Sequence, residues 1–385
     1  MIKPGIEFFK DNVDEVIKSR NIALITGSAN IDSAGEPVFR VVKRLTGKKL
    51  KSIWSLQHGF FVDKQDNMIL SGSFYWQDFD LEVKSLYGEK LLPEEEWYNG
   101  IDAILVDAFD VGVRVYTFLN HIVRIMKALS GKNIAIIVLD RPNPLSGVDV
   151  EGNMSHEEFF SLVGEIPVPM RHALTVGEYL SYALTYYGID LELEIVKVQN
   201  WRRERFVEGT WTYPSPNMPS FNTAVAYPGA VMLEGTNLSE GRGTTRPFEF
   251  TGAPFIDNFK LVKDLENLDL PAVQFIPIFF KPEFSKFAGE VCKGILVRPE
   301  NIAGFRSFAT YYEVIRLVRN NYPGDFKWKE PPYEFEYERP PIDMICGSSF
   351  IRKSIEKDLP FNVIEKKINE ELIDYHQTVD PFLLY

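Results

Sequence analysis

Short apolar runs alternate with longer amphipathic stretches through about the first 200 residues of this 385-residue chain. The apolar runs predict strands, and residues 113–131 predict a helix, because apolar side chains recur there at helical spacing before Gly131. This alternation indicates an open parallel sheet of the α/β class, with crossover helices on both faces. The predicted strands are 21–26, 50–56, 103–108, 134–140 and 191–198.

The chain after about residue 206 has a different pattern, rich in Pro and aromatic residues. A strand is predicted at 272–280 and a helix at 306–322, followed by a Pro-rich linker at 330–341 and a final pair of helices. A chain of this length, 45% hydrophobic, exceeds the size at which one core usually stops growing. We therefore expect two domains: 1–205 with the parallel sheet, and a smaller mixed α/β auxiliary domain at 206–385.

The composition of the chain indicates which partners and which cellular compartment to expect. The chain has 42 basic and 54 acidic residues, a net charge of −12, which makes a poor surface for nucleic acid or anionic lipid. No apolar stretch is long enough to span a bilayer or to form a signal peptide, so the sequence as written predicts a cytoplasmic protein, or an exported one whose leader was removed. Cys292 and Cys346 fit a reducing compartment and are expected to pack in the core.

Polar residues follow four of the predicted strands at the point where each strand ends. In an open α/β sheet, ligands bind outside the carboxyl ends of the strands, so these side chains are expected to converge although they are far apart in sequence. The residues are Gly27 and Ser28, then Gln57 and His58, then Asp107 and Asp110, and finally Asp140, Arg141 and Asn143.

The motifs of common cofactors are missing from the sequence. No G-x-G-x-x-G follows the first predicted strand, no G-x-x-x-x-G-K-[ST] occurs, and the nearest string, GRGTTR, has Arg246 where the third glycine belongs. The five histidines stand singly, without the spacing of metal ligands. We expect neither a nucleotide cofactor nor a metal. Among the histidines, His121 is interpreted as structural, and His58 and His172 are expected to face the cleft.

The Gly-rich segment 234–257 concentrates polar groups on a pattern that fits neither a helix nor a strand. Side chains held on irregular backbone either coordinate a ligand or satisfy one another, and a solvated loop with internal salt bridges is the alternative here. The candidates in this segment are Glu234, Asn237, Glu240, Arg242, Thr244 and Arg246.

Several other carboxylates have structural interpretations. Thr175 with Glu178 matches a capping box that starts a helix, and Ser155 with Glu158 repeats the pattern. Asp110 stands shortly before the helix predicted from 113 and is a preferred N-cap residue. A capping role is compatible with a catalytic one, because a helix N-terminus at this edge of the sheet is itself a site.

Seven blocks in order along the chain resemble the exo-β-N-acetylmuramidase (NamZ-like) family, long described only as a domain of unknown function. The resemblance implies a Rossmann-like half and an auxiliary half. It also implies an enzyme that removes N-acetylmuramic acid from the non-reducing ends of peptidoglycan fragments. The blocks are 106–118, 138–147, 169–178, 214–220, 227–237, 234–257 and the terminal PFLLY.

Glycoside hydrolysis needs one carboxylic acid to protonate the leaving oxygen and a second group to attack or to activate water. On a continuous strand, Glu234 and Glu240 would lie about 20 Å apart, so one of them is expected to work with Asp107 or Asp110. The lactyl carboxylate of muramic acid suits an arginine, for which Arg141, Arg242 and Arg246 are candidates; a salt bridge within the chain is the alternative for each. The other candidate substrate-binding residues are Asn143, His172, Asn217, Asn237 and Thr244.

One position departs from the family pattern. Members typically read P-E-H-G at the end of the second strand, whereas this chain reads LQHG at 56–59. Gln57 has no carboxylic proton to donate, and losing a general acid commonly costs about 10²–10⁴ in rate. Either another carboxylate acts, or the substrate differs, or the protein is a non-catalytic muramyl-glycan-binding protein. If the site is otherwise intact, Gln57→Glu is expected to raise hydrolysis about 10²-fold.

Overall fold

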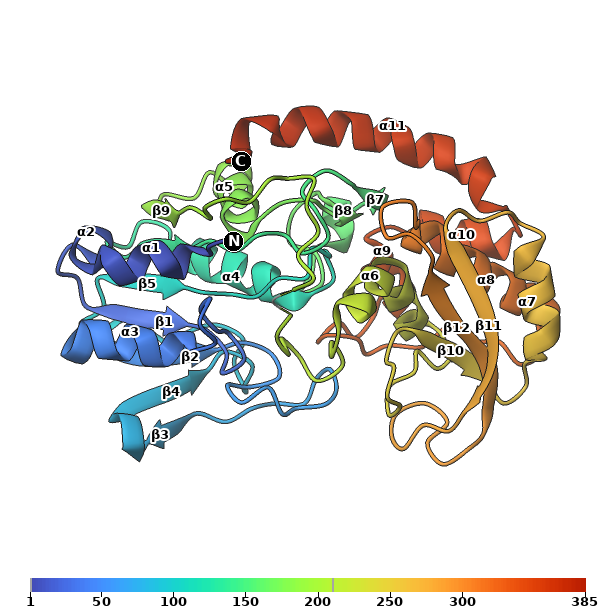
Figure 1. Ribbon diagram of the computed structural model, residues 1–385, viewed down its shortest axis with the longest axis horizontal. Coiled ribbons are helices and arrows are strands. Elements are labelled where there is room, and N and C mark those ends of the chain that lie inside the picture. Colours follow the sequence, from blue (N-terminus) through green and yellow to red (C-terminus); the bar gives the residue numbers. More distant parts are fainter. Residues whose placement is uncertain (1, 210) are drawn as a thin grey trace.

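The computed structural model describes residues 2–209 and 211–385. Two lobes lie side by side, one around a large sheet formed by the N-terminal half and one around a smaller sheet formed by the C-terminal half (Figure 1). The last long helix, α11 (Phe361–Val379), runs back from the second lobe, so that the C-terminus lies beside α5 (Val176–Tyr187) of the first.

The first lobe contains a seven-stranded sheet in the order β3-β4-β2-β1-β5-β6-β9. Neighbouring strands are parallel except the edge pair β3 and β4, which is antiparallel. All five strands predicted in this half are present and belong to this sheet. The strands are β1 (Ile22–Ile25), β2 (Leu50–Ser55), β3 (Phe74–Trp76), β4 (Leu81–Ser85), β5 (Ala103–Val106), β6 (Ala135–Leu139) and β9 (Leu193–Val196).

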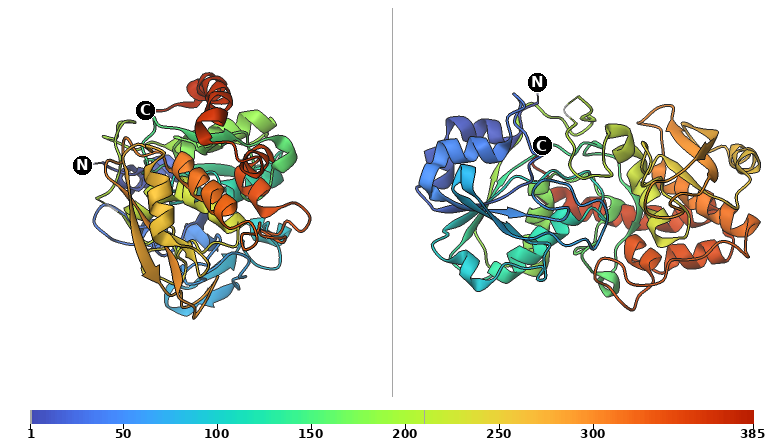
Figure 2. Two further views of the ribbon diagram at one scale, coloured as in Figure 1. Left: turned by 90° about the vertical axis from the view of Figure 1, so that its right-hand side faces the viewer. Right: turned by 90° about the horizontal axis from the view of Figure 1, so that it is seen from below.

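Helices cover both faces of this sheet, as parallel connections require. Residues of α1 and α3 pack with Leu24 and alternate strand residues on one face, and residues of α4 and α5 pack with Ile25 on the other. The right-hand view of Figure 2 shows helices on either side of the sheet. The helices around this sheet are α1 (Gly5–Asp11), α2 (Val13–Ile17), α3 (Val38–Thr46), α4 (Thr117–Leu129) and α5 (Val176–Tyr187).

The second lobe contains a three-stranded antiparallel sheet in the order β10-β12-β11. Its strands are β10 (Phe250–Ala253), β11 (Val273–Phe280) and β12 (Cys292–Pro299). Helices α6 (Phe221–Ala230), α7 (Asn258–Glu266), α8 (Ser307–Asn321), α9 (Pro341–Cys346) and α10 (Phe350–Glu356) pack around it. The mixed α/β fold with a smaller sheet is therefore confirmed, including the strand and helix predicted at 272–280 and 306–322.

The remaining short elements lie in connecting segments. A two-stranded ribbon of β7 (Glu151–Met154) and β8 (Pro169–Arg171) follows β6. The short 3-10 helices are η1 (Gly47–Lys49), η2 (Gln77–Phe79), η3 (Glu95–Tyr98), η4 (Glu157–Phe159), η5 (Val231–Gly235) and η6 (Asp380–Phe382).

Predictions of helix starts had mixed outcomes. The capping box of Thr175 and Glu178 is present at the start of α5. The repeat at Ser155 and Glu158 is wrong, because the short helix η4 there follows His156 without a side-chain cap. The helix predicted from 113 begins only at Thr117, so Asp110 is not its N-cap; its Oδ2 accepts a hydrogen bond from the amide of Gly112 instead.

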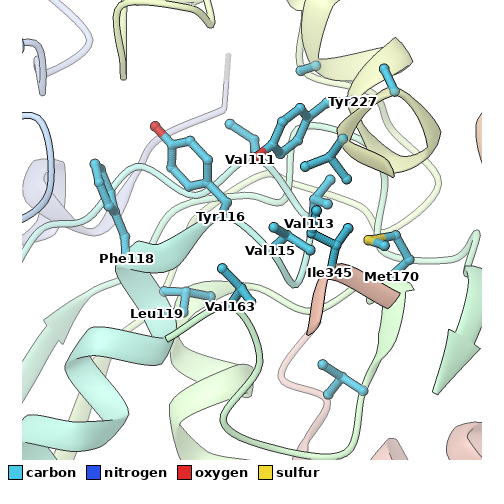
Figure 3. Close-up of a cluster of buried hydrophobic side chains, with 14 of the residues drawn as sticks. Val111, Val113, Val115, Tyr116, Phe118, Leu119, Val163, Met170, Tyr227 and Ile345 are labelled. Carbon is cyan, nitrogen blue, oxygen red and sulfur yellow. The ribbon is translucent and has the colours of Figure 1, made fainter. Parts of the chain in front are cut away.

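The segment between β5 and α4 joins the two lobes through apolar contacts. Val111, Val113 and Val115 lie in one buried cluster with Tyr227 of α6 and Ile345 of α9 (Figure 3). Val113 and Val115, which fall in the helix predicted from 113, are therefore buried between the lobes and lie before the helix begins. Full burial of each such side chain is worth about 1.5–3 kcal/mol, so this core holds the lobes together at the carboxyl edge of the parallel sheet.

Candidate functional site

A cavity lies where the carboxyl ends of β2 and β5 meet the second lobe, and we call it the inner cavity. Its empty volume, counted together with its opening to solvent, is about 470 Å³. The lining residues come from both lobes: Gln57, His58, Asn67, Val115, Tyr116, Thr117, Phe118, Ser215, Asn217, Met218, Tyr227, Glu234, Arg242, Phe248, Tyr333 and Glu334.

Gln57, which follows β2, is buried and fully hydrogen-bonded. Its Nε2 donates to Oε1 of Glu334 at 2.8 Å and lies 3.2 Å from the hydroxyl oxygen of Tyr87, and its Oε1 accepts from the hydroxyl of Thr117. The Tyr87 hydroxyl in turn donates to Oε2 of Glu334 at 2.6 Å. Each carboxylate oxygen of Glu334 is therefore held by one neutral donor.

Burial raises the pKa of Glu334 to about 7, although the hydrogen bonds from Tyr87 and Gln57 oppose the shift. The nearby charge of Glu234 raises the pKa further, and Arg242 lowers it. Glu334 and the next residue, Phe335, have φ values of 46° and 64°, in the left-handed region that non-Gly residues seldom adopt. A backbone of this kind persists where its surroundings determine it, and it is common at functional sites.

Arg242 lines the inner cavity and contacts two carboxylates, those of Glu234 and Glu240. Its Nη2 donates to Oε1 of Glu234 at 2.7 Å, and its Nε lies 3.2 Å from Oε1 of Glu240. The second oxygen of Glu234 accepts from the hydroxyl of Tyr333 at 2.7 Å. Burial works against the charge of Arg242, but Glu234 and Glu240 outweigh it and raise the pKa of the guanidinium.

Glu240 also pairs with Lys286 at 2.8 Å. Burial alone would raise the pKa of Glu240, but Lys286 and Arg242 lower it below its usual value. The expected separation of about 20 Å between Glu234 and Glu240 is wrong, because both contact one guanidinium. The chain between them is not one extended strand, because Glu234 lies in η5, which ends at Gly235.

His58 presents a neutral imidazole to the inner cavity. Burial lowers its pKa to about 4, and its Nδ1 lies 2.7 Å from the carbonyl oxygen of Lys64. A carbonyl can only accept, so Nδ1 carries the proton and Nε2 is an acceptor at neutral pH. His58 itself has φ 70°, which turns the chain sharply after β2.

A second, outer cavity adjoins the first and has a volume of about 810 Å³, including its opening to solvent. The two cavities share Asn67, Glu234 and Arg242. The other residues of the outer cavity are Asp66, Thr236, Asn237, Glu240, Ser285, Lys286 and Lys329. The shared wall means that one extended ligand can contact both.

Five of the residues predicted from the sequence line the inner cavity, namely Gln57, His58, Asn217, Glu234 and Arg242. Two more, Asn237 and Glu240, line the outer one. Asp107 lies beside Gln57 in the lining of a smaller neighbouring cavity. It forms a buried ion pair with Arg141, whose Nε and Nη2 donate to its two oxygens at 2.9 and 3.1 Å.

The other predicted residues lie outside the lining of these cavities, within the part of the chain that the structure describes. Asp110, in the segment between β5 and α4, has its Oδ2 3.3 Å from Nε2 of His172, and both side chains are buried. Asn143 donates to the carbonyl of Leu174 and accepts from the amide of Leu145, and Thr244 donates to the carbonyl of Gly241. The half-exposed Arg246 pairs with the buried Glu249. Asp140 accepts from Gly177, Thr175 and Tyr385, and burial raises its pKa to about 6.

Sequence reasoning missed Glu334, Tyr87, Tyr116 and Tyr333. The segment 330–341 was interpreted as a linker, yet it carries Tyr333 and Glu334 into the inner cavity. The available signal was aromatic content, because Glu334 lies between Tyr333 and Phe335, whereas solvated, disordered segments carry few aromatic residues. Residues 333 and 336 are paired by two backbone hydrogen bonds across this turn.

Among residues 2–209 and 211–385, no three His, Cys, Asp or Glu side chains are arranged to hold a metal ion. In the same residues no helix has both the length and the apolarity to cross a membrane.

The fold and site define a two-lobed α/β protein with a carboxylate-lined cavity at the carboxyl edge of its parallel sheet. Residues 22–222 match the family model described as exo-β-N-acetylmuramidase NamZ, N-terminal, and residues 225–385 match the C-terminal model. The chain therefore belongs to the NamZ family of exo-β-N-acetylmuramidases, which are glycoside hydrolases.

Individual relatives agree with this assignment. The chain is 32% identical over 387 residues to the peptidoglycan β-N-acetylmuramidase NamZ of Bacillus subtilis (strain 168), covering 100% of this chain and 91% of that protein. A solved DUF1343 family protein from Bacteroides fragilis NCTC 9343 superposes with a TM-score of 0.88 at 26% identity, covering 100% of this chain and 99% of the other. A second one from the same organism, 23% identical with the same coverage and a TM-score of 0.78, has the same fold.

Proposed function

We propose that this protein hydrolyses the β-glycosidic bond that joins N-acetylmuramic acid, at the non-reducing end of a peptidoglycan fragment, to the next sugar. The family supplies the reaction class. The observation that carries the proposal is that Glu234 and Glu334, from two different segments, line one buried cavity. Glycoside hydrolysis requires such a pair: one group to protonate the leaving oxygen and one to attack or to activate water.

The form of the two cavities supports action at a chain end. Most residues around the inner cavity are buried, so it suits a terminal sugar better than a glycan strand passing through. The outer cavity adjoins it at Glu234 and Arg242 and offers room for the following sugar.

Cationic groups at the outer cavity support recognition of an acidic sugar. Arg242 and Lys286 are already paired with Glu234 and Glu240. Lys329 differs, because its ammonium group lies over the ring of Tyr333, 5.6 Å from the centroid, and forms no ion pair with a described residue. The lactyl carboxylate of muramic acid is a suitable partner for this charge.

A second candidate function is binding of muramyl glycans without turnover. It is favoured by Gln57, which has an amide where the family pattern has a carboxylic acid. The two candidates predict the same ligand and differ in whether the glycosidic bond breaks.

The test is to incubate the protein with the disaccharide N-acetylmuramyl-β-1,4-N-acetylglucosamine and to quantify released N-acetylmuramic acid. Binding of the same disaccharide is measured by calorimetry, and a fragment that ends in N-acetylglucosamine is the control. Release from the muramyl end alone supports the hydrolase. Binding without release supports the second candidate, and neither binding nor release contradicts both.

A further inference from the structure

Four carboxylates line the inner and outer cavities, and Glu334 differs from the other three. Asp66, Glu234 and Glu240 each lie within 3.8 Å of a nitrogen of Arg242. Glu334 is held only by the Gln57 amide and the Tyr87 hydroxyl, both neutral, among the described residues. A buried carboxyl without a cationic partner favours its protonated form, whereas one paired with arginine favours the carboxylate.

The orientation of the Gln57 amide follows from its partners. Nε2 faces the carboxylate of Glu334, which can only accept when ionised, and Oε1 faces the hydroxyl of Thr117, which donates. Gln57 therefore fixes the carboxyl of Glu334 at the end of β2, the same place where the family pattern puts its own glutamate. Position 57 has no carboxyl group in this chain, but the carboxyl of Glu334 is hydrogen-bonded directly to the Gln57 side chain.

Building on the proposed function, we propose that Glu334 is the catalytic acid of this chain and that Gln57 is its positioning residue. The carboxyl of Glu334 gives its proton to the glycosidic oxygen as the bond from that oxygen to C1 breaks and the electron pair passes to the oxygen. One water adds its hydroxyl to C1, and the proton that this water releases returns to Glu334 directly or through solvent. The products are free N-acetylmuramic acid and the shortened glycan.

The energetic balance at Glu334 suits this role. Its pKa of about 7 places it near half protonation at neutral pH, where a general acid both holds its proton and gives it up readily. The hydrogen bond from Tyr87 lowers the pKa of Glu334, since it favours the carboxylate. Loss of that hydroxyl must therefore raise the pKa at which the acid loses its proton.

Leaving-group dependence distinguishes a proton donor from a residue that only shapes the site. In Glu334→Gln, kcat/KM for N-acetylmuramyl-N-acetylglucosamine is expected to fall about 10²–10⁴-fold, because a sugar alkoxide leaves poorly without a proton. For 2,4-dinitrophenyl β-N-acetylmuramide, whose leaving group needs no proton, the loss is expected to stay below about 10-fold. Glu338→Gln, an exposed change four residues away, is the control and keeps both rates.

Two further variants keep the proposal testable if Glu334→Gln folds poorly. The double variant Gln57→Glu/Glu334→Gln exchanges the two side chains, so that the carboxyl stands at position 57 and the amide at position 334. Its kcat/KM is expected to be at least about 10-fold higher than that of Glu334→Gln alone. Tyr87→Phe is expected to shift the alkaline limb of the wild-type pH–rate profile to higher pH. Melting temperatures of all variants are measured beside the rates.

The outcomes separate this proposal from the proposed function. If the wild type releases N-acetylmuramic acid and Glu334→Gln loses equal activity on both substrates, or none on either, the protein is a hydrolase and Glu334 is not its acid. An unmoved alkaline limb in Tyr87→Phe also overturns the role of Glu334. If the wild type hydrolyses neither substrate, the proposed function fails together with the acid assigned to it.

Discussion

The amide of Gln57 donates a 2.8 Å hydrogen bond to Oε1 of Glu334, and these two residues are 277 positions apart along the chain. Gln57 follows a strand of the first lobe, and Glu334 lies in a turn between two helices of the second. The contact therefore crosses the junction of the lobes at the inner cavity. Any change in how the lobes pack would alter the environment of the buried carboxyl, so fold and chemistry are coupled at this pair.

The raised pKa of Glu334 predicts a specific effect on stability. A carboxyl whose pKa is about 7 when folded and lower when unfolded contributes stability at low pH, and this contribution is lost as the pH rises through 7. Glu334→Gln removes the cost of burying the charge. The unfolding free energy of the variant minus that of the wild type is therefore expected to be larger above pH 8 than at pH 4, by on the order of 2–3 kcal/mol. Denaturant unfolding of both proteins at pH 4 and pH 8.5 measures this. An equal difference at the two pH values would contradict the raised pKa.

Substitution of Glu234 is expected to affect activity more than stability, and substitution of Glu240 is expected to affect stability more than activity. Glu240 is buried and is held by two cations, the buried Arg242 and the partly exposed Lys286, so Glu240→Gln leaves charge uncompensated and is expected to cost about 3–5 kcal/mol of unfolding free energy. Glu234 faces the inner cavity, and in Glu234→Gln the guanidinium retains Glu240. This variant is expected to lose more activity and less stability. Unfolding curves and kcat/KM for both variants test the ordering, and the reverse ordering would assign the two roles the other way round.

The sequence predicted the parallel sheet well because short apolar runs and amphipathic helices have distinct periods. The strands at 103–108 and 134–140 appear as β5 and β6, completely buried as expected. The predicted start of α4 was wrong, because apolar residues at helical spacing before Thr117 pack between the lobes instead (Figure 3). Local periodicity cannot tell burial against a distant element from burial along a helix.

The site was predictable only where it follows the sheet. Gln57 and His58 line the inner cavity as residues at a strand end, in accord with the position rule for parallel sheets. Polar residues at other strand ends have partners within the protein. Asp107 forms an ion pair with Arg141, and Asp140 accepts a hydrogen bond from the hydroxyl of Tyr385 in the terminal PFLLY. No local pattern distinguishes these from ligand-facing residues, because their partners are remote in sequence.

Lys329 provides a test of sugar recognition. Its ammonium group lacks a carboxylate partner among the described residues and lines the outer cavity, so Lys329→Met is expected to weaken binding of N-acetylmuramic acid about 3–10-fold and to leave N-acetylglucosamine unchanged. Lys327→Met, an exposed lysine two residues before it, is the matched control. Calorimetric titration with both sugars gives the affinities. Equal losses for the two sugars would show that Lys329 supports the site in another way.

Gln57→Glu tests whether the acid belongs at position 57 or at 334. The substituted carboxyl would replace an amide 2.8 Å from Glu334, and two carboxyls at that distance share one proton, which raises the pKa at which the pair loses this shared proton. With Glu334 already acting as the acid, the gain is expected to be less than about 10-fold at pH 6, smaller than the 10²-fold expected from the sequence alone. The alkaline limb of the pH–rate profile is expected to move upward. Rates from pH 5 to 9 on N-acetylmuramyl-N-acetylglucosamine measure both effects. A gain of 10²-fold or more at every pH would show that position 57 is the place for the acid and that Glu334 only holds it.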